Sequence, residues 1–383
     1  MTTRRHPTGT TQPADSGKAH PHLFATSPLS LWWSLLREYG GVRPRYRGRL
    51  AGILATSALT APLRLAERLR YGRRVARTEI RRAPVFIQGF ARSGTTHLHN
   101  LMAHDPGLGY VSTLHASAAP FFLISRGWLD RLIAGRLPSK RPMDNVAVSL
   151  DLPQEEELAL AAASRLSSVH LLSFPGRAGE IVAKMGAMRL TEAEMREWTG
   201  CYLHVLRKAT LASDGRRLVL KTPANLGRTD RLLRLFPAAK FVFVVRNPYV
   251  VFASTMKLYR TLIPMYRLQD VDWDVVEASV FSNYVDMTRR YMRDRTSIPK
   301  GNLIEVRFED IEADAMGVLE RVYGTLGLPR WERARKPVAE YLGTLSGYRK
   351  NRYRFDRSMI DKVDREWGFA VREWGYEPPN VND

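Results

Sequence analysis

The chain contains 383 residues and carries 59 lysines and arginines against 38 acidic residues, a net charge of +21 with neutral histidine. Its 44% of apolar and 10% of aromatic residues can fill a sizeable core, which excludes a globally disordered chain. The single cysteine, Cys201, excludes an internal disulfide and favours a reducing cytoplasm. The charge indicates an anionic partner, which is nucleic acid, an acidic membrane surface or a multiply phosphorylated small molecule.

The positive charge is concentrated near the N-terminus, where residues 1–81 contain 15 basic and 4 acidic residues. Residues 1–27 are rich in Thr, Pro, Gly and His, and they predict a disordered tail without the apolar stretch of a signal peptide. Residues 28–82 predict a basic amphipathic helical segment. In this segment Trp32 and Trp33 lie in an apolar cluster that is followed by four closely spaced arginines.

Two roles for residues 28–82 are open from the sequence. Tryptophan and leucine beside arginine suit a helix lying in the interface of an anionic membrane. The same pattern suits a helical pair that packs on the domain with its arginines in water. The apolar run 50–63 cannot cross a bilayer, because roughly 14 residues stand where about 20 are needed.

Residues 83–383 predict one α/β domain. Short apolar runs at 85–87, 218–220, 241–245 and 302–308 predict strands, and a helix is expected after the first and over 226–236. Strands separated by helices favour a parallel sheet that binds its ligand at the carboxyl ends of the strands. Residues 112–215 have a mostly helical pattern and predict an insertion over the sheet.

The strongest motif is the segment 89–96, Gly-Phe-Ala-Arg-Ser-Gly-Thr-Thr, which follows a strand and opens a helix. Free backbone N–H groups and the positive end of the helix dipole predict an anion site there. Its glycine spacing is that of a nucleotide-triphosphate loop, but Thr95 stands where that loop needs lysine. Arg92 supplies the positive charge from within the loop, so hydrolysis of ATP or GTP is not expected.

Two further signals follow predicted strands. Lys221 comes directly after residues 218–220, and Arg246 comes directly after residues 241–245. Pro248 suits the first turn of a helix, which would carry Ser254 near Arg246. The carboxyl ends of parallel strands meet at one sheet edge, so these groups are expected to converge with the loop.

In this order the motifs resemble those of the PAPS-dependent sulfotransferases, in particular a bacterial branch with Arg-Ser-Gly-Thr-Thr in its phosphosulfate loop. The resemblance covers about residues 84–376. The segments that carry it are 92–96, 141–145, 152–157, 220–223, 246–254, 306–310 and 347–353.

The resemblance implies a P-loop-like three-layer fold with a central parallel sheet, a largely helical insertion and an N-terminal amphipathic helical segment. It implies PAPS as the sulfuryl donor and adenosine 3′,5′-bisphosphate as the product. The residues that would surround the 5′-phosphosulfate are Arg92, Ser93, Gly94, Thr95 and Thr96. Those that would hold the 3′-phosphate are Arg246 and Ser254, with Arg349, Lys350 and Asn351 closing over it.

Catalytic roles follow from the same resemblance. Lys221 would stabilise or protonate the leaving phosphate oxygen, and Arg92 would share that task. Cationic side chains and backbone donors suffice for in-line sulfuryl transfer, so no metal is expected. Related sequences place a histidine where this chain has Pro223, and the general base is therefore sought elsewhere. His115 is the first candidate. The alternatives are Glu155, Glu156 and Asp144.

The resulting hypothesis is a cytoplasmic sulfotransferase that acts on a hydroxyl of a hydrophobic or lipid-linked acceptor, as a peripheral protein on the inner face of the membrane. The apolar run 118–124 either lines an acceptor tunnel or packs in the core. A hydrophilic acceptor is the alternative substrate. A P-loop kinase is the second hypothesis. The third is a nucleic-acid-binding protein that uses the basic N-terminus, and nucleic acid ranks last because tryptophan and leucine accompany the arginines.

Overall fold

The computed structural model describes residues 22–125, 127, 149–345 and 353–381. Within these ranges the centre is a parallel sheet of five strands in the order β2-β3-β1-β4-β5. The strands are β1 (Val85–Gln88), β2 (Leu108–Gly109), β3 (Arg217–Lys221), β4 (Lys240–Val245) and β5 (Leu303–Arg307). All four predicted strands are confirmed. Strand β2 was not predicted, because two residues are too few to show a hydrophobic pattern.

Side chains of the sheet enter the core on both faces. In β1 the ring of Phe86 joins one hydrophobic cluster, whereas Val85 and Ile87 join another on the opposite face. This alternation follows from the two-residue repeat of a strand. The central strands β1 and β4 are therefore buried on both sides, which is typical of a parallel sheet between two layers of helices.

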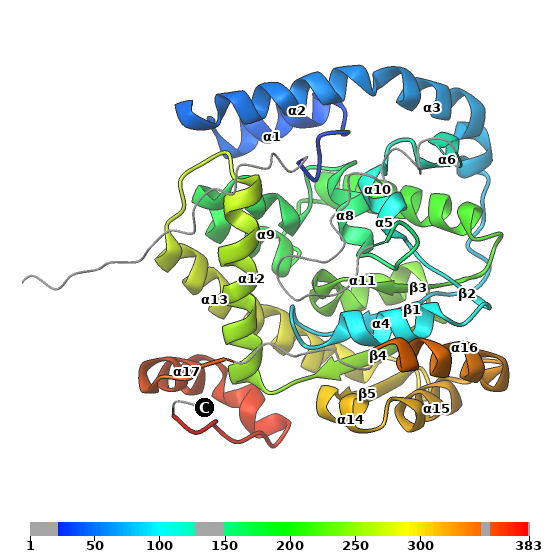
Figure 1. Cartoon of the computed structure of the whole chain (residues 1–383), viewed down its shortest axis with the longest axis vertical. Helices are drawn as coiled ribbons and strands as arrows, with labels where there is room; N and C mark the ends of the chain where they lie inside the picture. The colour runs from blue at the N-terminus through cyan, green and yellow to red at the C-terminus, as the bar shows by residue number, and fades with distance from the viewer. Residues whose placement is uncertain (1–21, 126, 128–148, 346–352, 382–383) are drawn as a thin grey trace, which may run out of the picture.

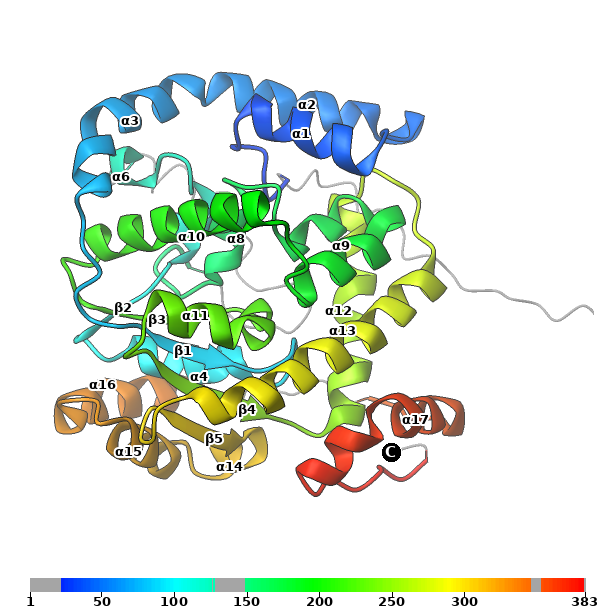
Figure 2. The same cartoon turned by 180° about the vertical axis from the view of Figure 1, so that it is seen from behind.

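Helices cover both faces of the sheet (Figures 1 and 2). One face packs against helices that share a cluster with Val85 and Ile87. These helices are α4 (Thr95–Ala103), α14 (Phe308–Ala313), α15 (Ala315–Leu326) and α16 (Trp331–Thr344). A third hydrophobic cluster includes Phe243 and Val245 of β4, and three long helices contribute to it. These are α12 (Pro248–Tyr266), α13 (Trp273–Asp294), which the short η5 (Arg295–Ser297) follows, and α17 (Arg357–Glu373).

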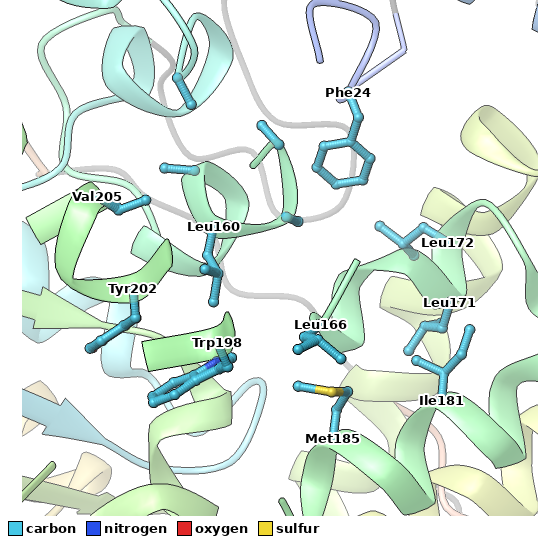
Figure 3. Packing of buried hydrophobic residues seen from close by; sticks show 14 of the residues in the cluster. Phe24, Leu160, Leu166, Leu171, Leu172, Ile181, Met185, Trp198, Tyr202 and Val205 are labelled. Carbon is cyan, nitrogen blue, oxygen red and sulfur yellow. The ribbon is translucent and has the colours of Figure 1, made fainter. Parts of the chain in front are cut away.

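The predicted insertion is largely helical in its described residues and covers the other face. Its elements are α5 (Thr113–Ser117), α6 (Phe122–Ser125), α8 (Glu156–Ala161), η2 (Ser168–Leu172), η3 (Pro175–Arg177), α9 (Ala178–Gly186) and α10 (Glu192–Ala212). Figure 3 shows Leu160 and Trp198 of this layer and Phe24 of the N-terminal segment, which are members of one hydrophobic cluster. One core thus joins the N-terminal segment, the insertion and the sheet.

The helix predicted over residues 226–236 has a different beginning. The chain forms η4 (Pro223–Arg228), and only then α11 (Thr229–Leu235). Gly227 lies so close to the carbonyl of Gly186 that a Cβ atom would stand 2.3 Å from its oxygen. Glycine at position 227 permits this close approach of η4 to the end of α9.

The N-terminal segment forms α1 (Leu29–Tyr39), η1 (Pro44–Tyr46), α2 (Arg47–Leu59) and α3 (Ala61–Ala76). Trp32 is fully buried, and its Nε1 donates to the carbonyl of Phe24 at 3.1 Å. Phe24 is itself only 1% exposed. Residues 22–27 are therefore packed, and their prediction as part of a disordered tail is wrong, because Phe24 supplies an aromatic anchor within a polar composition.

Helix α1 packs on the domain through its buried side, but other side chains of the N-terminal segment 28–82 are exposed to solvent. Trp33, next to the buried Trp32, is 71% exposed. Of the described helices, none is both long and apolar enough to cross a membrane.

We expect the two adjacent tryptophans to contribute unequally to stability. Trp32→Ala removes a fully buried ring and its hydrogen bond to Phe24, and should lower the free energy of unfolding by about 3–5 kcal/mol. Trp33→Ala should change it by no more than about 0.5 kcal/mol. Urea denaturation of both variants measures the difference, and equal effects would contradict the packing of α1.

Candidate active site

The loop between β1 and α4 forms a compact cradle at the carboxyl edge of the sheet. Gly94 has a φ of 91°, and a Cβ there would lie 1.9 Å from the ring of Phe308. Arg92 also has a positive φ, of 70°. Ser93 and Thr95 are buried on either side of Gly94. Since the loop ends at the amino terminus of α4, its backbone can present N–H groups to an anion.

Two arginines meet beside this cradle, as the sequence predicted. The Nε of Arg92 donates to the Oγ of Ser254 at 2.9 Å, and Arg246 donates to the carbonyl of Arg92 at 3.1 Å. The Arg246 guanidinium lies 4.4 Å from the ring centre of Phe308. Burial lowers the pKa of Arg246, which means that its charge has lost part of its hydration. A bound anion would stabilise this charge in place of the water that it has lost.

Tyr353 completes this cluster and was not singled out from the sequence. Its hydroxyl donates to the Oγ of Ser254 at 2.8 Å. The sequence signal that could have identified it is its place at the end of the motif 347–353.

The remaining predicted cofactor residues of that motif, Arg349, Lys350 and Asn351, lie outside the described residues. Residues 128–148, which include the candidate base Asp144, also lie outside them.

Lys221 ends strand β3 next to β1, where its Cα is paired with that of Ile87. Its side chain is 2% exposed, and its Nζ donates to an oxygen of Glu155 at 2.6 Å. The Glu155 side chain keeps 27% exposure. The strand end therefore brings together the predicted catalytic lysine and one of the predicted bases, with the carboxylate open to solvent.

The two following carboxylates are deeply buried. Glu156 accepts from the amide nitrogen of Asn225 at 2.6 Å and from the hydroxyl of Tyr202 at 3.3 Å. Burial, together with the charges of Glu157 and Glu155, raises the pKa of Glu156 to about 7. Glu156 therefore supports the turn after β3 from inside the protein. Its structural role was not visible in the sequence, which shows three glutamates in a row.

The third glutamate makes a buried ion pair. Glu157 binds both terminal nitrogens of Arg228, at 2.6 Å and 3.1 Å, and accepts from Ser167 at 2.7 Å. The Arg228 guanidinium lies 5.1 Å from the ring centre of Trp198. This pair ties α8 to η4, and so fixes the helix that begins directly after Glu155.

His115 lies in α5 with its ring stacked on Phe122, at 4.2 Å between centroids. Its Nδ1 accepts the backbone N–H of Ser112 at 3.2 Å. A backbone amide is always a donor, so the proton of the neutral ring resides on Nε2. Hydrogen bonds between residues 111–114 and 150–154 hold α5 beside the segment that leads to Glu155.

Most of the run 118–124 packs in a cluster with Val75 of α3, Leu114 of α5 and Ala212 of α10. Among the described residues, no group of three or more His, Cys, Asp or Glu is placed to hold a metal ion.

A parallel sheet with a glycine-bounded loop at its carboxyl edge, and with a lysine and two arginines near that loop, is typical of a protein with a P-loop-like fold. The model of the Sulfotransferase family matches residues 84–333. The chain belongs to this family and is a sulfotransferase.

Relatives and solved structures agree with this assignment. The chain is 30% identical over 321 residues to the omega-hydroxy-beta-dihydromenaquinone-9 sulfotransferase Stf3 of Mycobacterium tuberculosis and of Mycobacterium bovis, over 84% of this chain and 82% of each relative. Its fold is similar to that of STF9 from Mycobacterium avium, with a TM-score of 0.68 and 16% identity over 92% of this chain and 98% of that one. The fold of STF1 from Mycobacterium tuberculosis H37Rv gives a TM-score of 0.61 and 18% identity, over 82% and 85%.

The raised pKa of Glu156 predicts a pH-dependent stability. The unfolded chain loses this proton near 4.5 and the folded chain near 7, so the folded state holds more protons between these values. The contribution of Glu156 to wild-type stability should therefore fall as the pH rises through this interval. The difference in free energy of unfolding between Glu156→Gln and the wild type should shift by about 2 kcal/mol in favour of the variant from about pH 5 to about pH 8.

Thermal or urea unfolding across this pH range measures the difference, with Glu192→Gln as the control because Glu192 is almost fully exposed. If the difference between Glu156→Gln and the wild type does not depend on pH, Glu156 does not titrate in the raised range.

Proposed function

We propose that the enzyme transfers a sulfuryl group from PAPS to a hydroxyl of a hydrophobic or lipid-linked acceptor. The observation that carries this proposal is the contact between Lys221 and Glu155 at the edge of the sheet beside the phosphate loop. It supplies a cation for the leaving oxygen and a carboxylate for the acceptor proton. The printed name of the Stf3 relatives, an omega-hydroxy-dihydromenaquinone sulfotransferase, supports a hydroxyl on a largely apolar acceptor.

The cradle fits the donor that the family implies. Only glycine leaves room at position 94, where the backbone amides of the loop would take the 5′-phosphosulfate together with Ser93, Thr95 and Thr96. Arg246 and Ser254 would hold the 3′-phosphate, and Tyr353 orients the hydroxyl of Ser254. When bound, PAPS supplies an activated sulfuryl group on a phosphate leaving oxygen.

The chain's own residues then perform the remaining tasks. Lys221, freed from Glu155, stabilises the negative charge that develops on the leaving oxygen, and Arg92 adds a second positive charge. The acceptor oxygen forms its bond to sulfur as the bond between sulfur and the phosphate oxygen breaks. Glu155 takes the hydroxyl proton, since its carboxylate is partly exposed next to the reacting lysine.

The geometry favours Glu155 over His115 as the base. The Nδ1 of His115 already accepts a backbone hydrogen bond, which leaves the proton on Nε2 and no free lone pair directed at an acceptor. Its stacking on Phe122 and its bond to Ser112 suit a role in shaping the acceptor side of the site.

We further propose that the enzyme works in the cytoplasm, as a peripheral protein on the inner face of the membrane. The single cysteine is typical of a reducing compartment, and the basic segment 28–82 suits an anionic leaflet.

The donor assignment predicts a preference for a 3′-phosphorylated nucleotide. Adenosine 3′,5′-bisphosphate at 100 times its dissociation constant should stabilise the protein by about 2.7 kcal/mol, and ADP and AMP should stabilise it less. Arg246→Ala should remove this preference. A thermal-shift series with the three nucleotides measures it. Equal stabilisation by ADP with Mg²⁺ would instead favour the kinase hypothesis.

The base assignment predicts different kinetic signatures for two variants. Glu155→Gln should lower kcat by about 10²–10⁴-fold, with donor binding retained. His115→Gln should keep most of the wild-type kcat. Lys221→Met serves as the reference for complete loss of turnover. If His115→Gln loses kcat to this extent and Glu155→Gln does not, the two roles are reversed.

A further inference from the structure

Helices α2 and α3 present an apolar stripe to solvent. Leu59 is 80% exposed, Leu65 58% and Leu69 77%. Leu65 and Leu69 are four residues apart and therefore share one side of α3, and Leu59 is the last residue of α2, which precedes α3 by one residue. In Figures 1 and 2 this pair runs along one end of the molecule, opposite to α16.

The other side of the same pair is anchored, so the stripe cannot turn inward. Ser57 of α2 donates to the carbonyl of Ser27 at 2.5 Å. Glu67 of α3 is buried against Lys208 of α10, which also donates to the carbonyl of Ala119 at 2.6 Å. Val75 joins the cluster around α5 and α6. The exposed leucines are therefore held on the outer side of the pair.

Arginines accompany the leucines. Residues 47–77 contain eight arginines and one acidic residue, the buried Glu67. Four exposed arginines, Arg68, Arg70, Arg73 and Arg74, lie in α3 itself. A strongly cationic surface with exposed leucines complements a surface with anionic groups on the outside and an apolar layer directly below them.

We propose that the α2–α3 face, defined as Leu59, Leu65 and Leu69 with Arg68, Arg70 and Arg73, docks on an anionic lipid bilayer. This inference rests on the proposed function, because a lipid-linked acceptor resides in such a bilayer. Nucleic acid would bind the arginines through its phosphates but would offer no apolar surface to the leucines. A second copy of the chain would bring the same arginines together, which like-charge repulsion opposes.

Docking by this face places the acceptor side of the active site at the bilayer. The inner side of α3 shares a cluster with Leu114 and Phe122, and the ring of His115 is stacked on Phe122. One helix thus contacts the lipid on its outer side and supports the segment next to Glu155 on its inner side. The acceptor would reach the site without its apolar chain crossing water.

Vesicle co-sedimentation of the full-length protein tests the proposal. Wild-type protein should bind vesicles of phosphatidylcholine with phosphatidylglycerol, and much less those of phosphatidylcholine alone. The triple variant Leu59→Gln/Leu65→Gln/Leu69→Gln should bind the anionic vesicles at least about tenfold more weakly. Arg68→Gln/Arg70→Gln/Arg73→Gln should lose about fivefold for each arginine removed, and binding should weaken with salt.

Matched variants elsewhere should keep vesicle binding. Val275→Gln controls for an exposed apolar residue, and Arg321→Gln/Arg333→Gln/Arg335→Gln for exposed arginines at the opposite end. Equal binding of the leucine variant and the wild type would overturn the proposal. So would a wild-type dimer, by light scattering, that becomes a monomer in the leucine variant without any vesicle binding.

The failure of this proposal is distinct from failure of the proposed function. The leucine variant should retain its thermal shift with adenosine 3′,5′-bisphosphate and its turnover of a water-soluble hydroxyl acceptor. Loss of that shift in the wild type, with vesicle binding intact, would refute the donor assignment alone.

Discussion

The buried pair of Glu157 and Arg228 is the constraint on which the site depends. Both charges are out of water, so each requires the other, and removal of one partner would cost about 3–5 kcal/mol. The pair fixes α8 against η4, and this places Glu156 under Asn225 and Glu155 beside Lys221. Three consecutive carboxylates thus join the helical insertion to the edge of the sheet, each through a different partner.

The sequence predicted the sheet and the meeting of the loop with Arg246 and Ser254 well, because each of these signals is local. A buried strand followed by a glycine-bounded loop, or by a charged residue, can be recognised within ten residues or so. The meeting of Arg92, Arg246 and Ser254 then follows from the rule that parallel strands end at one edge. The acceptor side could not be predicted in this way. Whether His115 or Glu155 faces the lysine depends on long-range packing of the insertion.

The N-terminal segment shows a similar limit. Trp32 and Trp33 are chemically identical neighbours, yet one is in the core and the other in water. Composition identified the segment as amphipathic, and it drew attention to the tryptophans of α1. The exposed leucines of α3 were missed because arginines separate them in the sequence. Only the direction in which the helix is anchored, by Glu67 and Lys208, shows which side faces outward.

The contact between Lys221 and Glu155 also bears on the order of substrate binding. As long as the two side chains are paired with each other, neither the carboxylate nor the lysine is available to an incoming group. An anionic donor competes for the lysine and releases the carboxylate. We therefore expect a sequential mechanism with the donor bound first, in which the acceptor hydroxyl is activated only when the sulfuryl group is already in place.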